Sequence, residues 1–172
     1  MEQIIQLNSG AKLSPHFTLG ELVRSSHPEV YNIPSHEAIE NLKRVCVWLE
    51  VLRERFSGIA NADITSSRIT NSTEPTNSTE PIMISSGYRS PQLNKKVGGV
   101  ATSNHLTGCA VDIRVSGQEQ LITYAAILIQ YANESHQDFD ELLLERNRHG
   151  AIWLHFAVRP NGNRRKILFL AA

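Results

Sequence analysis

Residues 86–115 read SGYRSPQLNKKVGGVATSNHLTGCAVDIRV, and this stretch combines a hydrophobic strand with polar residues of the kinds that bind metals. The pattern after Gly108 predicts an extended strand, in which successive side chains face opposite sides of a sheet. Its apolar face consists of Cys109, Val111, Ile113 and Val115. Asp112 lies on the opposite face and needs a partner, because an unpaired buried carboxylate is costly. His105 precedes the strand, and Gly108 allows the chain to turn back and bring the imidazole to Asp112.

A second strand offers a third polar residue of the same kind. Residues 151–158 read AIWLHFAV, and their alternation predicts a core face formed by Ile152, Leu154, Phe156 and Val158. His155 then points away from the core, as Asp112 does, and is the best candidate for a third ligand. Two histidines and one aspartate leave one position open on a tetrahedral zinc ion, which is the arrangement of catalytic rather than structural sites.

The motifs together resemble a known family. They are Ser86-Gly-Tyr-Arg-Ser-Pro, Val97-Gly-Gly, the pattern SxHxxGxAxD at 103–112, and Trp153-x-His155. This set resembles the zinc D-alanyl-D-alanine carboxypeptidases and peptidoglycan endopeptidases, whose superfamily includes phage endolysins and the zinc-containing signalling domain of hedgehog proteins. Residues 17–22 and 41–42 resemble the single-domain branch common in phages and prophages.

The resemblance implies roles for individual residues. It implies that His105, Asp112 and His155 bind Zn²⁺, and that the substrate is a peptidoglycan stem or cross-bridge peptide containing D-amino acids. Arg89 matches the family's arginine that engages the substrate or its developing oxyanion, although it could instead pair with a carboxylate such as Asp112. Tyr88 and Ser103 are expected to contact the ligands or the substrate, as supporting groups do around metal sites.

The general base departs from the family pattern. In the best-known carboxypeptidases of the family it lies two or three residues before the last histidine, where this chain has Trp153 and Ile152. Neither side chain can accept a proton. If residues 146–150 form a turn, Glu145 lies across from Trp153 and diagonal to His155, within reach of a cross-strand neighbour. We therefore predict that Glu145 is the base, the alternative being a solvated carboxylate at a sheet edge.

The bulk composition narrows the functional classes. The chain has 172 residues, of which 17 are Lys or Arg and 17 are Asp or Glu, so nothing favours a nucleic acid or an anionic membrane as partner. A single domain and a monomer are expected. No apolar run is long enough to span a bilayer, and no secretory signal is visible, although action on the cell wall or in the periplasm is expected. Cys46 and Cys109 are predicted to be buried, with a thiolate role for Cys109 as the less favoured alternative.

The rest of the chain predicts an α+β scaffold. The principal helix is expected at residues 36–56, with Gly58 after its end. A flexible Thr/Ser/Asn/Pro-rich insertion is expected at about 60–81, where the hexapeptide TNSTEP occurs twice in succession. Residues 139–145, 151–158 and 166–170 are predicted to form an antiparallel meander. The expected architecture is a small antiparallel sheet with helices packed on one side, as in the hedgehog and D,D-peptidase domains.

Two rival functions come from other classes. In the first, the chain is a catalytically inactive, zinc-containing module that binds the cell wall or takes part in signalling. In the second, zinc is purely structural, which predicts a fourth protein ligand and unfolding on chelation. A Ser-His-Asp hydrolase is a poor fit, because no nucleophile elbow is present.

Overall fold

The structure of this chain is a computed structural model, and it describes residues 10–67 and 81–171. Apart from Pro81, both copies of the TNSTEP repeat lie outside the described residues, as does most of the predicted insertion. Residues 60–67 of that predicted insertion instead belong to a helix.

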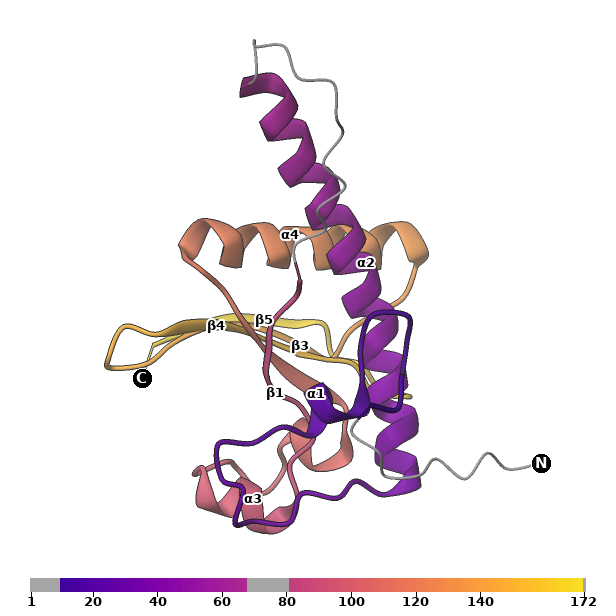
Figure 1. The fold of residues 1–172 in the computed structure, drawn as a ribbon, viewed down its shortest axis with the longest axis vertical. Coiled ribbons are helices and arrows are strands. Elements are labelled where there is room, and N and C mark those ends of the chain that lie inside the picture. Colours follow the sequence, from indigo (N-terminus) through magenta and orange to yellow (C-terminus); the bar gives the residue numbers. More distant parts are fainter. Residues whose placement is uncertain (1–9, 68–80, 172) are drawn as a thin grey trace, which may run out of the picture.

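Helices and strands are interspersed in the first part of the chain, and three successive strands follow the last helix (Figure 1). In order they are α1 (Leu19–Val23), α2 (His36–Ser67), β1 (Ile84–Ser86), α3 (Pro91–Lys96), η1 (Asn104–Thr107), β2 (Ala110–Arg114), α4 (Gln118–Ser135), β3 (Glu141–Arg146), β4 (Ile152–Ala157) and β5 (Lys166–Ala171). Among the described residues, no helix is both long and apolar enough to cross a membrane.

The predicted end of the principal helix was wrong. Helix α2 continues past Gly58 as far as Ser67. A single glycine inside a helix costs only about 1 kcal/mol relative to alanine, so it weakens a helix without ending it. Only a glycine in the left-handed conformation ends a helix in the expected way, and Gly58 does not have a positive φ.

The sheet has five strands in the order β1-β2-β4-β3-β5. The pairs β1–β2, β2–β4 and β3–β4 are antiparallel, but β5 pairs with β3 in parallel. The sheet is therefore mixed, and the predicted antiparallel meander was wrong in its last strand. Strand β4 has β2 on one side and β3 on the other, so β5 can join only at an outer edge. The chain passes over the start of β3 to reach that edge, with the backbone N–H of Lys166 donating to the Asp140 carbonyl.

The two faces of the sheet have different functions. Helices α2 and α4 pack on one face, where Trp48 of α2 contacts the rings of Tyr131, Phe139 and Phe156 at centroid distances of 4.8, 6.2 and 5.2 Å. In Figure 1, α4 lies on one side of the sheet, and α1 and α3 lie on the other. The face turned away from α4 carries the polar residues of β2, β3 and β4, and it forms the floor of the candidate site.

Candidate metal centre

His105 is held by the short helix η1. Its backbone N–H donates to the hydroxyl of Ser103, the N-cap of this helix, at 3.3 Å. Gly108 ends the helix with a φ of 73°, and a Cβ at this position would lie 2.4 Å from the Ala38 carbonyl oxygen. The turn that returns the chain to β2 therefore requires glycine. The imidazole Nδ1 lies 2.6 Å from the Gly87 carbonyl and donates to it, which leaves the Nε2 lone pair free to bind a metal.

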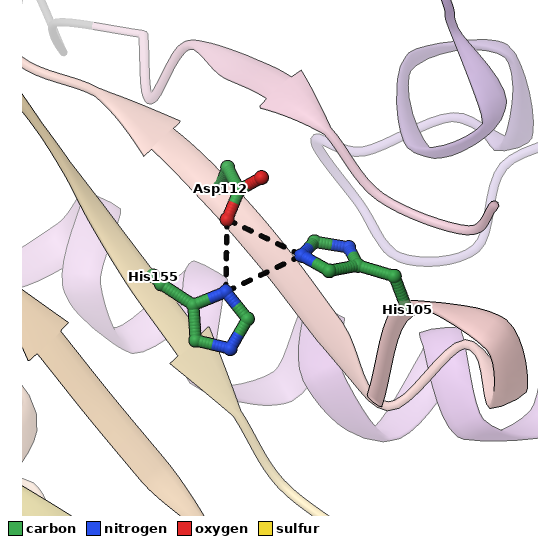
Figure 2. A group of neighbouring side chains, drawn as sticks. All are labelled: His105, Asp112 and His155. Atoms are coloured by element: carbon green, nitrogen blue, oxygen red, sulfur yellow. Dashed lines mark hydrogen bonds and ion pairs between the residues drawn. The ribbon is translucent and has the colours of Figure 1, made fainter. Parts of the chain in front are cut away.

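Asp112 and His155 are direct neighbours across β2 and β4. Asp112 Oδ1 lies 2.9 Å from His155 Nδ1 and 3.3 Å from His105 Nε2, and the two imidazole nitrogens are 3.3 Å apart. Figure 2 shows these three atoms converging on one point from η1, β2 and β4. The structure thus brings together all three residues that the sequence predicted as ligands.

The distances within this cluster suit a zinc ion. Zinc binds imidazole nitrogen and carboxylate oxygen at about 2.0–2.2 Å, so two ligand atoms of a tetrahedral site lie about 3.3 Å apart. The three measured separations of 3.3, 3.3 and 2.9 Å are close to that value. The side chains are also shielded from water, with exposed fractions of 2% for His105, 8% for Asp112 and 7% for His155. The donor set and its geometry therefore fit zinc.

The three groups titrate differently because each has different partners. Burial lowers the pKa of His105 and favours the neutral imidazole that a metal needs. Burial alone would raise the pKa of Asp112, but the two histidines outweigh it and hold the pKa well below its ordinary value. Burial alone would lower the pKa of His155, yet the carboxylates of Asp112 and Glu141 raise it to about 9. Without a metal, His155 therefore carries a proton at neutral pH.

Arg89 contacts the cluster directly. Its Nη2 donates to Asp112 Oδ2 at 2.5 Å, and its Nε donates to the Ser86 hydroxyl at 2.8 Å. The pairing with Asp112, which the sequence left open as an alternative, is thus present. Arg89 also lines the cavity above the cluster, so the pairing and a contact with a bound molecule are compatible.

A cavity of about 1010 Å³ lies over the cluster, and it contains most of the predicted site residues. Ser103, Glu145 and Trp153 line it together with Arg89. Glu145 pairs in register with Trp153, and Leu143 pairs with His155, so Glu145 is diagonal to His155 as the hairpin predicted. Burial raises the pKa of Glu145 above its ordinary value.

Neither Tyr88 nor Cys109 is among the residues that line this cavity. The Tyr88 side chain is 7% exposed and belongs to the hydrophobic core, so the structure gives it no contact with the cavity. Cys109 is buried as expected, and burial raises the pKa of its thiol, which disfavours a thiolate.

Sequence reasoning missed Glu141. It lines the same cavity, and its Oε2 lies 3.6 Å from His155 Nε2. His155, Lys166 and Arg164 lower the pKa of its carboxyl to about 2. The alternation of β3 puts Glu141, Leu143 and Glu145 on one face, so the sequence could have shown which face Glu141 occupies, but not its partners Arg164 and Lys166.

Comparison with known proteins agrees with this geometry. No curated protein matches the chain. A family profile described as Peptidase M15 matches residues 57–149, which is more than half of the sequence and includes His105, Asp112 and Glu145. His155 lies beyond the matched range, so its assignment to the cluster rests on the distances above. The chain belongs to the peptidase M15 family, a family of zinc-dependent peptidases.

Proposed function

We propose that this chain is a zinc-dependent peptidase that hydrolyses a peptide bond in the stem or cross-link peptides of peptidoglycan. The observation that carries the proposal is the convergence of His105 Nε2, Asp112 Oδ1 and His155 Nδ1 at the separations of a tetrahedral zinc site. Within the described part of the chain, these three side chains lie close enough together to hold a metal ion between them. Three protein ligands leave a fourth position for water or substrate, as in catalytic zinc sites.

His105, Asp112 and His155 would hold the zinc ion, which would supply Lewis acidity for deprotonating water and polarising the carbonyl of the scissile bond. The chain's own residues do the rest. Glu145 is the proposed general base: it accepts a proton from the attacking water and returns it to the departing amine. Its raised pKa suits both steps, because a proton carrier is most efficient when its pKa is near the working pH.

Arg89 is the proposed partner of the developing oxyanion. A guanidinium has five N–H donors, and the contacts with Ser86 and Asp112 use only part of this fork. The remaining donors can stabilise negative charge on the substrate oxygen, and donors that are already in place do so effectively. Ser103 lines the same cavity and is proposed to contact the substrate.

The proposed substrate rests on the motif pattern. The sequence around Arg89, the SxHxxGxAxD run and Trp153-x-His155 resemble the D,D-carboxypeptidases and endopeptidases of the single-domain branch found in phages and prophages. We accordingly propose a hedgehog-type zinc domain that acts on the cell wall. Of the two rival functions, the inactive binding module makes a distinct prediction, namely stoichiometric zinc without cleavage.

The test is mass spectrometry of fragments released from purified peptidoglycan by the zinc-loaded protein. A chelated sample and the His155→Ala variant serve as controls. We expect new zinc-dependent peptide termini, and their masses identify the bond: loss of a terminal D-amino acid indicates a carboxypeptidase, and release of cross-linked halves indicates an endopeptidase. If several wall chemistries give no release although zinc is bound, the proposal is wrong and the binding module replaces it.

A further inference from the structure

One atom at the centre of the site has no hydrogen-bond partner. His155 Nε2 is buried, and within the described residues no donor or acceptor lies at hydrogen-bond distance from it. In Figure 2 this nitrogen lies on the side of the His155 ring that faces away from Asp112 Oδ1 and His105 Nε2. A buried polar atom without a partner is costly, so such an atom in a native protein needs an explanation.

The carboxylate of Glu141 lies on that side of the imidazole. Its Oε2 is 3.6 Å from His155 Nε2, slightly beyond a hydrogen bond. Glu141 begins β3 and pairs with Ala157, which makes it the diagonal neighbour of His155 on the same face of the sheet. A small side-chain shift would therefore complete the contact without any movement of the strands.

Glu141 is itself held in place from several directions. Asn104 donates to its Oε2 at 3.0 Å, while Arg164 and Lys166 lie 2.9 and 3.3 Å from its Oε1. These partners come from η1, from the loop that precedes β5, and from β5 itself. A carboxylate fixed by three elements can orient a neighbouring ring at little further entropic cost.

We propose that Glu141 is the positioning residue of the metal centre: it accepts the Nε2–H of His155, and so fixes the tautomer whose Nδ1 binds the metal. This inference rests on the proposed function, because it presupposes zinc at the cluster. A histidine that binds a metal through one nitrogen commonly donates its other N–H to a carboxylate or a carbonyl, which sets the ring orientation and raises ligand basicity.

The same arrangement is present at His105 with the nitrogens exchanged. There Nδ1 donates to the Gly87 carbonyl and Nε2 faces the cluster. At His155 the converging atom is Nδ1, so the acceptor must stand beyond Nε2, where Glu141 lies. Glu141 and Glu145 thus have separate tasks, since the first acts through His155 and the second acts on the substrate.

The test compares the zinc affinity of three proteins: the parent, Glu141→Gln and Glu145→Gln. Each affinity is measured by competition with a chelator. Glutamine keeps the size of the side chain and an acceptor oxygen but removes the charge. We expect about 10- to 100-fold weaker zinc binding for Glu141→Gln, the usual effect of losing such a partner. We expect parent-like affinity for Glu145→Gln, which serves as the matched control from the same strand and cavity. The absorption spectrum of the cobalt-substituted Glu141→Gln protein should also change, which a purely structural role on β3 would not cause.

Equal zinc affinity in the parent and Glu141→Gln would overturn the inference, and so would an equal loss in both variants. A parent protein that binds no zinc would instead refute the proposed function, and the inference with it. Should Glu141→Gln not fold, nitrogen-15 NMR of the zinc-loaded parent decides the question. A His155 ring protonated at Nε2 with a slowly exchanging proton supports the proposal, and a ring bound to zinc through Nε2 overturns it.

Discussion

Zinc binding to this chain should be coupled to the release of one proton. Without a metal, Asp112 and Glu141 raise the pKa of His155 to about 9, so His155 is protonated at neutral pH. A protonated imidazole cannot bind zinc, so the ion must displace that proton. The other two groups need no such change, because burial lowers the pKa of His105 and the pKa of Asp112 is held far below its ordinary value.

The size of this effect on zinc affinity follows from the difference between the pKa of His155 and the working pH. With His155 near pKa 9, the competition at neutral pH spans about two pH units and weakens zinc binding about 100-fold. At 1.36 kcal/mol per unit, this corresponds to about 3 kcal/mol. Zinc affinity should therefore rise about tenfold for each pH unit between about pH 6 and 8, and should level off as the pH approaches the pKa of His155.

Two measurements check this expectation. Chelator competition at about pH 6, 7 and 8 gives the slope, and calorimetry in two buffers of different ionisation enthalpy gives the number of protons released. His149→Gln is the control, because His149 is an exposed histidine of the β3–β4 turn and should leave both values unchanged. A zinc affinity that stays flat between about pH 6 and 8 would show that His155 is neutral without a metal, and would refute the reasoning.

Three further predictions concern single residues. Glu145→Gln should lower turnover by about 10²- to 10⁴-fold while zinc content, measured by metal analysis, stays stoichiometric, and full turnover would remove Glu145 from the mechanism. Asp140 is fully buried and contacts Arg159, Arg164 and Asn104. Its pKa is lowered to about 2, so its charged form stabilises the fold above about pH 4 and does so progressively less as the pH falls towards 2. Asp140→Asn should therefore lose about 1–2 kcal/mol of unfolding free energy at neutral pH in urea titrations and much less near pH 2, and an equal loss at both would contradict the assignment. Gly108→Ala should destabilise by about 2 kcal/mol or more, because of the positive φ and the close Ala38 carbonyl, whereas Gly58→Ala, in open space within α2, should stabilise by about 0.5–1 kcal/mol in the same assay.

The parts of the site that the sequence predicted correctly depend on local periodicity. Side chains alternate along a strand, so the apolar residues around Asp112 and His155 determine which way these two side chains point. The structure pairs them directly across β2 and β4. The same rule predicted that Glu145 lies across from Trp153, since a short turn sets the register of a hairpin. Each of these inferences needed information from only a few neighbouring residues.

The features that the sequence did not reveal depend on contacts between distant segments. Tyr88 follows directly after a motif glycine, yet its side chain turns into the core, and no alternation within 86–90 could show this. Gly58 is a strong stop signal by composition, but whether a helix continues depends on more than one residue. Strand β5 cannot pair with β4, because β2 and β3 already occupy both sides of that strand. Its position in the sheet therefore depends on the pairing of β2 with β4.

The missed strand pairing and the missed residue have one cause. In an antiparallel meander, β5 would lie beside β4, and β4 would separate Lys166 from Glu141. The parallel addition of β5 instead pairs Lys166 with Glu141 in register, and the loop before it brings Arg164 to the same carboxylate. These contacts fix Glu141 beside His155, so the short crossover from β4 to β5 also completes the surroundings of the metal centre. Since Glu141 could be assigned a role only after the strand order was known, the function of a polar residue on a sheet follows from topology as well as from the alternation of its own strand.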